Sequence, residues 1–116
     1  MRIVAQVLDG AFGKSAAGVR AQLARSDGPG WIVIADAETG QDGCVEAWDG
    51  PPLGHGVYRV VFDSGRYFAG LGASSAYPEV TLVFRTQDES ATFQIKVTLA
   101  PYSYAAYFGT IDGVTN

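Results

Sequence analysis

The sequence has very little cysteine and histidine, and each shortage excludes a class of chemistry. One of the 116 residues is cysteine, Cys44, and one is histidine, His55. A single cysteine cannot form a disulfide within the chain, so a reducing, cytoplasmic setting is expected. His55 has no second histidine or cysteine pair at ligand spacing, so no metal site is predicted. The glycine-rich stretches lack the strand, turn and helix of a phosphate loop, which argues against a nucleotide cofactor.

Basic residues and long apolar runs are also scarce. Eight Lys and Arg residues face twelve Asp and Glu residues, which gives a net charge of -4. Nucleic acids and anionic membrane surfaces are bound through basic patches, so neither is expected as a partner. The first ten residues contain Gln6 and Asp9 where a signal peptide would be apolar, and no apolar run approaches ~18 residues. The sequence therefore predicts neither export nor membrane anchoring.

Apolar residues, by contrast, are abundant for a chain of this size. They make up 47% of the sequence, against 17% charged residues. A chain of this length is expected to form one domain and to bury roughly two thirds of its unfolded surface. The apolar excess indicates that part of the surface lies in an oligomer interface.

Alternating apolar and polar residues predict short strands along the whole chain. The expected strands cover residues 3–8, 19–25, 31–37, 44–48, 57–63, 79–86, 91–99 and 102–108. The Asp-Gly pair of TGQDG predicts a tight hairpin turn, because glycine supplies the positive φ. The stretch SGRYFAGLGASS has room for one short helix. This pattern predicts an all-β fold, a two-sheet antiparallel β-sandwich with one short helix.

The side to which each strand points its polar residues indicates where a site can form. Residues 92–99 alternate strictly, so one face carries Thr92, Gln94, Lys96 and Thr98. The first strand is apolar on both faces apart from Gln6. Such a strand is expected to have its own sandwich core on one side and a neighbouring subunit on the other.

Several stretches of the sequence resemble the transthyretin-like family, and its enzyme branch, the 5-hydroxyisourate hydrolases, more than transthyretin itself. They are QVLDGAFGKSAAGV, the TGQDG turn after a tryptophan, YRVVFDSGRYFA, YPEV and PYSYAAYFGT. The resemblance covers nearly the whole chain and implies a transthyretin-like sandwich at residues 1–110 with an extension at 111–116. It also implies a homotetramer, a dimer of dimers around a central channel that takes a small-molecule substrate.

The resemblance further implies that the catalytic residues of the hydrolases are replaced. The histidine of their HVLD motif is Gln6 here, the arginine after the DG turn is Cys44, and the second histidine of HYHVP is Gln94. Their C-terminal YRGS reads YFGT and ends at Thr110. A glutamine amide does not titrate near neutral pH as imidazole does, and a thiol does not reproduce the fork of arginine. Loss of 5-hydroxyisourate hydrolysis is therefore expected.

Each replaced position has a functional and a structural interpretation. Gln6 and Gln94 either position a substrate by hydrogen bonds or satisfy a buried subunit interface. Cys44 is either a thiol nucleophile or a small buried residue. Lys96, which occupies the proline position of HYHVP, and Glu46 are either a pair of proton-transfer groups or a solvated cross-strand ion pair.

The C-terminal tyrosines and the tail leave similar alternatives open. Tyr104 and Tyr107 either donate hydrogen bonds to a ligand or pack at an interface. The tail after Thr110 either narrows the channel mouth or has no fixed place.

We interpret the chain as a repurposed enzyme that cyclises or isomerises a small cyclic metabolite, in specialised biosynthesis. Orientation of the substrate is the contribution that such residues can make. The expected catalytic residues are Gln6, Cys44, Gln94 and Lys96, and the expected substrate-binding residues are Glu46, Tyr104, Tyr107 and Thr110. Two alternatives remain: non-catalytic binding of a small molecule in the channel, and retained 5-hydroxyisourate hydrolysis through a changed site.

Overall fold

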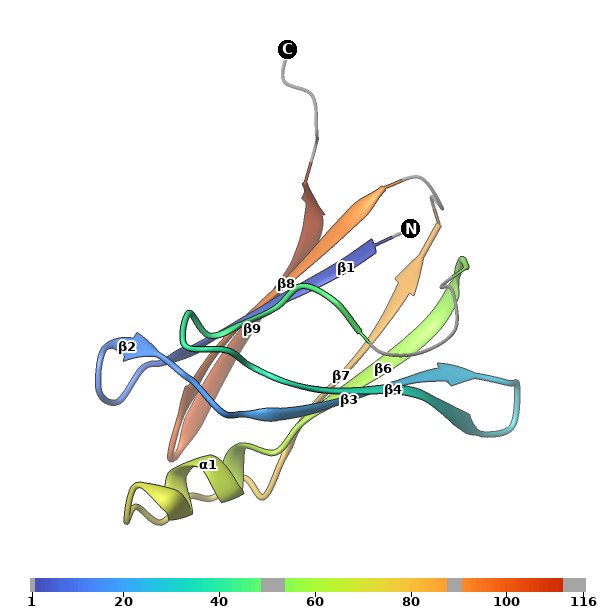
Figure 1. The fold of residues 1–116 in the computed structure, drawn as a ribbon. Helices are drawn as coiled ribbons and strands as arrows, with labels where there is room; N and C mark the ends of the chain where they lie inside the picture. The colour runs from blue at the N-terminus through green and yellow to red at the C-terminus, as the bar shows by residue number, and fades with distance from the viewer. Residues whose placement is uncertain (1, 49–53, 88–90, 112–116) are drawn as a thin grey trace.

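The computed structural model describes residues 2–48, 54–87 and 91–111, which form strands in two layers with a short helix at one end (Figure 1). In chain order the elements are β1 (Arg2–Asp9), β2 (Lys14–Ser15), β3 (Arg20–Ser26), β4 (Trp31–Glu38), β5 (Cys44–Val45), β6 (Gly56–Phe62), α1 (Ser64–Gly70), β7 (Val80–Thr86), β8 (Thr92–Ala100) and β9 (Ser103–Ile111). The predicted β-sandwich with one short helix is confirmed for the described residues.

The strands divide into two hydrogen-bonded sheets. Sheet A has the order β2-β1-β8-β9, with β5 also paired to β1, and sheet B has the order β4-β3-β6-β7. All pairs are antiparallel except β1 and β8, which run parallel from Arg2 opposite Thr92 to Asp9 opposite Leu99. The two-sheet antiparallel sandwich expected from the sequence is confirmed, and this parallel pair is an exception within sheet A. Parallel strands are joined by long connections and not by a tight turn, so the local sequence contains no turn motif that would predict this pairing.

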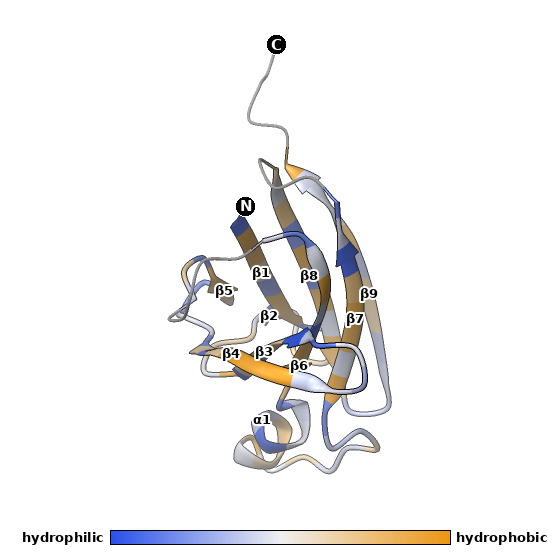
Figure 2. Ribbon diagram, turned by 90° about the vertical axis from the view of Figure 1, so that its right-hand side faces the viewer, coloured by the Kyte–Doolittle hydropathy of each residue, from blue (hydrophilic) through white to orange (hydrophobic). Residues whose placement is uncertain are grey.

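The core lies between the sheets and follows the alternation of β1 and β8. Every second residue of β8, from Phe93 through Leu99, points inward and is buried. From sheet B, Tyr58, Val60 and Phe62 of β6 face them and are also fully buried. Figure 2 shows the same alternation as bands of opposite hydropathy along β8. The period-2 pattern therefore fixes which face of sheet A points away from the core.

The predicted hairpin at TGQDG is a crossover between the sheets. Gly43 has φ +78, as the turn prediction requires, and a side chain there would collide with the Val7 carbonyl. However, β4 before the turn belongs to sheet B and β5 after it belongs to sheet A. The Gly43 carbonyl accepts a hydrogen bond from the Val7 amide at 2.8 Å. The turn thereby places Cys44 beside β1.

The strand predicted for residues 44–48 ends early, at Val45. Trp48 instead donates a hydrogen bond from its indole Nε1 to the Ile3 carbonyl at 3.0 Å. Its ring packs against the edge of the core. Beyond Val45, the described contact of this segment with β1 is thus made by the Trp48 side chain and not by backbone pairing.

At the far end of β1, a buried carboxylate connects the sheet to α1. Asp9 accepts hydrogen bonds from the amides of Ala11 at 2.9 Å and Phe12 at 2.8 Å, and from the Tyr67 hydroxyl at 2.7 Å. Tyr67 lies on α1, which spans only seven residues.

No helix in the described part of the chain is long and apolar enough to cross a membrane.

The predicted boundary after residue 110 falls inside the last strand. Ile111 is still paired with Thr92 and completes β9. The remainder of the expected extension, residues 112–116, lies outside the described residues.

Candidate functional site

Four of the predicted site residues form one line across sheet A. Cys44 on β5 is the register partner of Gln6 on β1, Gln6 is the partner of Lys96 on β8, and Lys96 is the partner of Tyr107 on β9. Paired residues of neighbouring strands point to the same side, and strands lie about 4.8 Å apart. The four side chains therefore border a strip roughly 14 Å long on the outer side of the sheet.

A second line runs beside the first. Val4 on β1 is the partner of Gln94 on β8, and Gln94 is the partner of Gly109 on β9. The Tyr107 phenol lies over Gly109, so that a side chain at Gly109 would collide with the ring and hydroxyl. We call the surface formed by Gln6, Cys44, Gln94, Lys96 and Tyr107 the polar face. The glycine allows the Tyr107 ring to lie along β9 toward the row of Gln94.

Glu46 joins the polar face at one end but does not pair with Lys96. Its carboxylate lies 3.5 Å from the Arg2 guanidinium, and both side chains are more than half exposed. The alternative of a Lys96–Glu46 ion pair is therefore wrong. An exposed pair such as Arg2–Glu46 contributes at most about 1 kcal/mol to stability.

The thiol of Cys44 is held in its protonated form. Burial raises its pKa, and the negative charges of Asp42 and Glu46 raise it further. The Sγ also lies within hydrogen-bond distance of the Asp42 carbonyl, at 3.7 Å. A nucleophilic cysteine needs a cation or imidazole that lowers its pKa, and the carboxylates have the opposite effect. The environment supports the interpretation of Cys44 as a small, partly buried residue.

Tyr104 and Thr110 do not join the polar face. Tyr104 is the register partner of Leu99 and Thr110 that of Phe93, and both partners point into the core side of sheet A. Tyr104 packs edge-on against Tyr77, with ring centroids 5.1 Å apart. Tyr104 and Tyr107 are three residues apart, so a strand must point them to opposite faces. The alternation of side chains along a strand therefore predicts from the sequence that Tyr104 and Tyr107 lie on opposite faces of the sheet.

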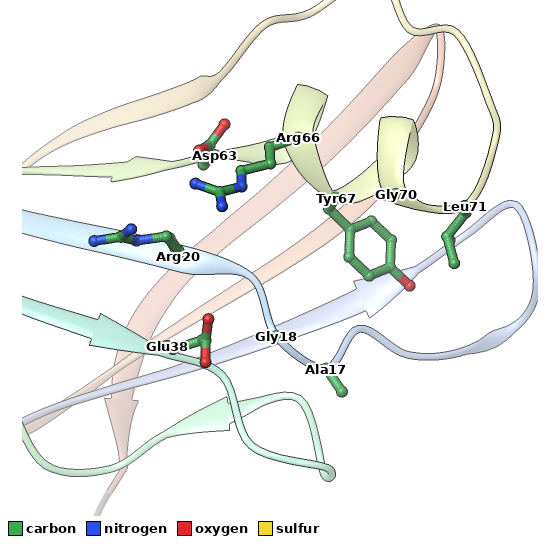
Figure 3. A pocket seen from close by; sticks show the side chains of 9 residues that line it. All are labelled: Ala17, Gly18, Arg20, Glu38, Asp63, Arg66, Tyr67, Gly70 and Leu71. Atoms are coloured by element: carbon green, nitrogen blue, oxygen red, sulfur yellow. The ribbon is translucent and has the colours of Figure 1, made fainter.

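A charged hollow that the sequence did not indicate lies at the α1 end of the sandwich (Figure 3). Its volume is about 400 Å³, and its lining includes Arg20, Glu38, Asp63 and Arg66. Figure 3 shows these side chains on β3, on β4, on the residue just before α1, and on α1 itself. Opposite charges are mixed and three of the four are exposed, as in an ordinary solvated surface. The hollow contains none of the predicted site residues.

Metal ligands do not gather on the part of the chain that the structure describes. No three His, Cys, Asp or Glu side chains there are placed to hold a metal ion. The absence of a metal or other cofactor stays a prediction.

The chain is similar along most of its length to proteins of one family. The sequence model of the HIUase/Transthyretin family matches residues 3–109 of this chain. A 5-hydroxyisourate hydrolase of Deinococcus radiodurans is 35% identical over 113 residues, which cover 93% of this chain and 95% of the relative. A 5-hydroxyisourate hydrolase of Mus musculus is 32% identical, with 93% and 94% covered.

Solved structures agree with the fold. The 5-hydroxyisourate hydrolase of Klebsiella pneumoniae superposes with a TM-score of 0.82 at 25% identity, covering 94% of this chain and 99% of the other. Sea bream transthyretin in complex with thyroxine gives a TM-score of 0.88 at 23% identity, covering 98% of both chains. At that identity the transthyretin match shows the fold alone.

The comparisons overturn the prediction of a repurposed cyclase or isomerase. Relatives 30–35% identical over at least 90% of the chain are named 5-hydroxyisourate hydrolase. That prediction was drawn from three replaced positions. At Gln6, Cys44 and Gln94 the replacements are all polar or polarisable side chains that remain on one face of sheet A. The findings favour the alternative of hydrolysis through a changed site.

Proposed function

The chain belongs to the HIUase/Transthyretin family, and we propose that it hydrolyses 5-hydroxyisourate at the polar face of sheet A. The observation that carries this proposal is the unbroken line of Cys44, Gln6, Lys96 and Tyr107 across four strands. Relatives of this chain are named 5-hydroxyisourate hydrolase. The line brings together groups that donate and accept hydrogen bonds, and a flat, polar ring could lie on it.

Hydrolysis requires water to be held against a ring carbonyl. The water oxygen forms a bond to the carbonyl carbon, the ring C–N bond breaks, and the departing nitrogen takes a proton. Gln6 and Gln94 lie on adjacent strands, two register positions apart. Their amide oxygens can accept hydrogen bonds from the water while their NH₂ groups donate to the substrate. Orientation of this kind contributes to catalysis without a group that titrates near neutral pH.

Glu46 is the proton acceptor that we propose. The negative charge of Glu46 raises the pKa of the Cys44 thiol, so the carboxylate lies near Cys44. Cys44 is the register partner of Gln6, so Glu46 also lies near Gln6. Arg2, at 3.5 Å, holds the carboxylate at this end of the polar face. A carboxylate in reach of the attacking water can take its proton and return one to the departing nitrogen.

The second wall of the site would come from another copy of the chain. In a single chain the polar face is one side of a sheet, with Lys96 and Tyr107 exposed. We propose a homotetramer in which two such faces enclose the substrate in a channel. The exposed edge strand β9, with Tyr107, Phe108 and Ile111 all at least 38% exposed, supports an assembly that covers it. A cytoplasmic setting is proposed on the ground of the single cysteine.

Loss of freshly generated 5-hydroxyisourate, followed by ultraviolet absorbance, tests the proposal. The wild-type chain is expected to accelerate the loss over buffer. Glu46→Gln is expected to lower kcat by about 10²-fold or more, because the proton acceptor is removed. Glu38→Gln, an exposed carboxylate of the hollow at α1, is the matched control and should leave kcat unchanged.

Two results would contradict parts of this account. A wild-type rate equal to that in buffer would reject hydrolysis itself. Acceleration that Glu46→Gln leaves intact would reject Glu46 as the proton acceptor and leave water positioned by the two glutamines.

A further inference from the structure

Lys96 is the one cation of the polar face that has no acidic partner among the described residues. The strands of sheet A contain three cationic residues, Arg2, Lys14 and Lys96. Arg2 is paired with Glu46 at the end of the face. Lys14 is the register partner of the inward-pointing Asp9, and its ammonium lies 6.0 Å from the Phe12 ring. Among the described residues, Lys96 is therefore the cation without an acidic partner whose register position lies at the centre of this surface.

The neighbours of Lys96 are neutral groups that form hydrogen bonds. Gln6 is its partner on β1, Tyr107 its partner on β9, and Gln94 the next residue of β8 on the same side. The Tyr107 ring is turned along β9 over Gly109. An ammonium bordered by amides and a phenol, with no carboxylate of the described residues paired to it, is a site for a negatively charged or strongly polarised oxygen.

The Lys96 side chain is long enough for its charge to reach the strip that the two glutamines border. Adjacent strands lie about 4.8 Å apart, which a lysine side chain spans easily. A planar ring lying over Gln6 and Gln94 would therefore bring a carbonyl oxygen within reach of the Lys96 ammonium. The flexible four-carbon stem lets the charge follow the oxygen as the carbonyl becomes tetrahedral.

We propose that Lys96 is a catalytic residue that binds the oxyanion formed when water adds to the ring carbonyl. This inference rests on the proposed hydrolysis of 5-hydroxyisourate. As the C–O bond forms, the carbonyl electron pair moves to the oxygen, where the ammonium holds it. The pair then returns to carbon, the ring C–N bond breaks, and the nitrogen leaves with that bond's electrons and takes the proton removed from water. Lys96 keeps its own proton throughout.

The test compares Lys96→Met with Lys96→Arg and with Lys14→Met, the matched control on the other lysine of the chain. Lys96→Met is expected to lower kcat by about 10²- to 10³-fold, the usual effect of removing one oxyanion donor. The KM is expected to change much less, because the charge acts mainly after water has added. Lys96→Arg should keep a large part of the activity, and Lys14→Met all of it.

Rescue by a small amine separates chemistry from structure. Methylammonium added to Lys96→Ala is expected to restore part of kcat in proportion to its concentration, which a purely structural role of the side chain would not allow. A Lys96→Met variant with wild-type kcat, or a Lys96→Ala variant that methylammonium does not rescue, would overturn the assignment. A wild-type chain that does not accelerate the reaction would instead reject the proposed hydrolysis.

Discussion

At the residue scale, the surroundings of a side chain decide its chemistry more than its type does. Cys44 occupies the polar face beside Gln6, where a thiol could attack a bound ring. Burial and the charges of Asp42 and Glu46 nevertheless keep the thiol protonated by raising its pKa. Lys96 lies on the same line with no carboxylate among the described residues within 4.0 Å of its ammonium. Its charge is therefore available to a ligand, while the thiol contributes little reactivity.

Cys44→Ser is expected to leave kcat/KM within about threefold of wild type, because a protonated thiol is not the nucleophile. In the wild-type protein, alkylation by iodoacetamide should be slower than that of a free cysteine peptide and should speed up only as the pH rises toward the raised pKa of Cys44. The paired measurements are the 5-hydroxyisourate assay and the mass of the alkylated protein. Rapid alkylation at neutral pH, or loss of turnover in the serine variant, would show a reactive thiolate instead.

At the element scale, a hydrogen bond to a buried acid links α1 to sheet A, in addition to the packing of Phe68 in the core. The Tyr67 hydroxyl donates to Asp9 Oδ2 at 2.7 Å, and Asp9 is 1% exposed. Burial, then the hydrogen bond and the charge of Asp9, raise the pKa of Tyr67 to about 12. The phenol thus stays protonated in the folded chain at pH values where an unfolded tyrosine, with its usual pKa near 10, has begun to ionise.

Tyr67→Phe is expected to lower the free energy of unfolding by about 1–2 kcal/mol at neutral pH, since a hydrogen bond to a carboxylate is lost. In wild type the folded state keeps the phenolic proton more tightly than the unfolded state. This stabilising contribution is therefore fully present below pH ~10 and is lost as the pH rises toward ~12. Urea unfolding at several pH values measures both effects.

The matched control for Tyr67→Phe is Tyr102→Phe, at a position 69% exposed, which should leave the stability unchanged. The alkaline loss of stability should be smaller in Tyr67→Phe than in wild type. Equal alkaline slopes in the two proteins would contradict the assignment of that loss to Tyr67.

The elements also show what the sequence could and could not predict. The strict alternation of residues 92–99 placed Gln94 and Lys96 on one face, and the structure agrees. The register that brings Gln6 opposite Lys96 comes from parallel pairing of two distant segments, for which no local pattern exists. The two-residue strand β2 was missed because it is too short to show a period. Tyr104 was assigned to the site although the same period of two separates it from Tyr107.

At the scale of the whole molecule, the fold follows from a pattern spread over the entire chain, whereas the predicted loss of hydrolysis depends on a few positions. Phe84 of sheet B packs on Phe108 with ring centroids 4.9 Å apart, and Phe108 also stacks on Phe93 at 5.3 Å. Such contacts join the edges of the two sheets and depend on many residues at once. Replacement of three side chains on the outer face leaves this framework intact, and relatives 30–35% identical over at least 90% of the chain are named 5-hydroxyisourate hydrolase.

Hydrolysis at the polar face can be tested by the product formed from 5-hydroxyisourate in water enriched in ¹⁸O, sampled during the first turnovers of the wild-type chain. Hydrolysis at the polar face predicts a ring-opened acid that carries one oxygen from water and forms faster than in buffer. An accelerated reaction whose product contains no solvent oxygen would mean isomerisation or cyclisation. Labelled product formed only at the buffer rate would show that the polar face does not catalyse the reaction.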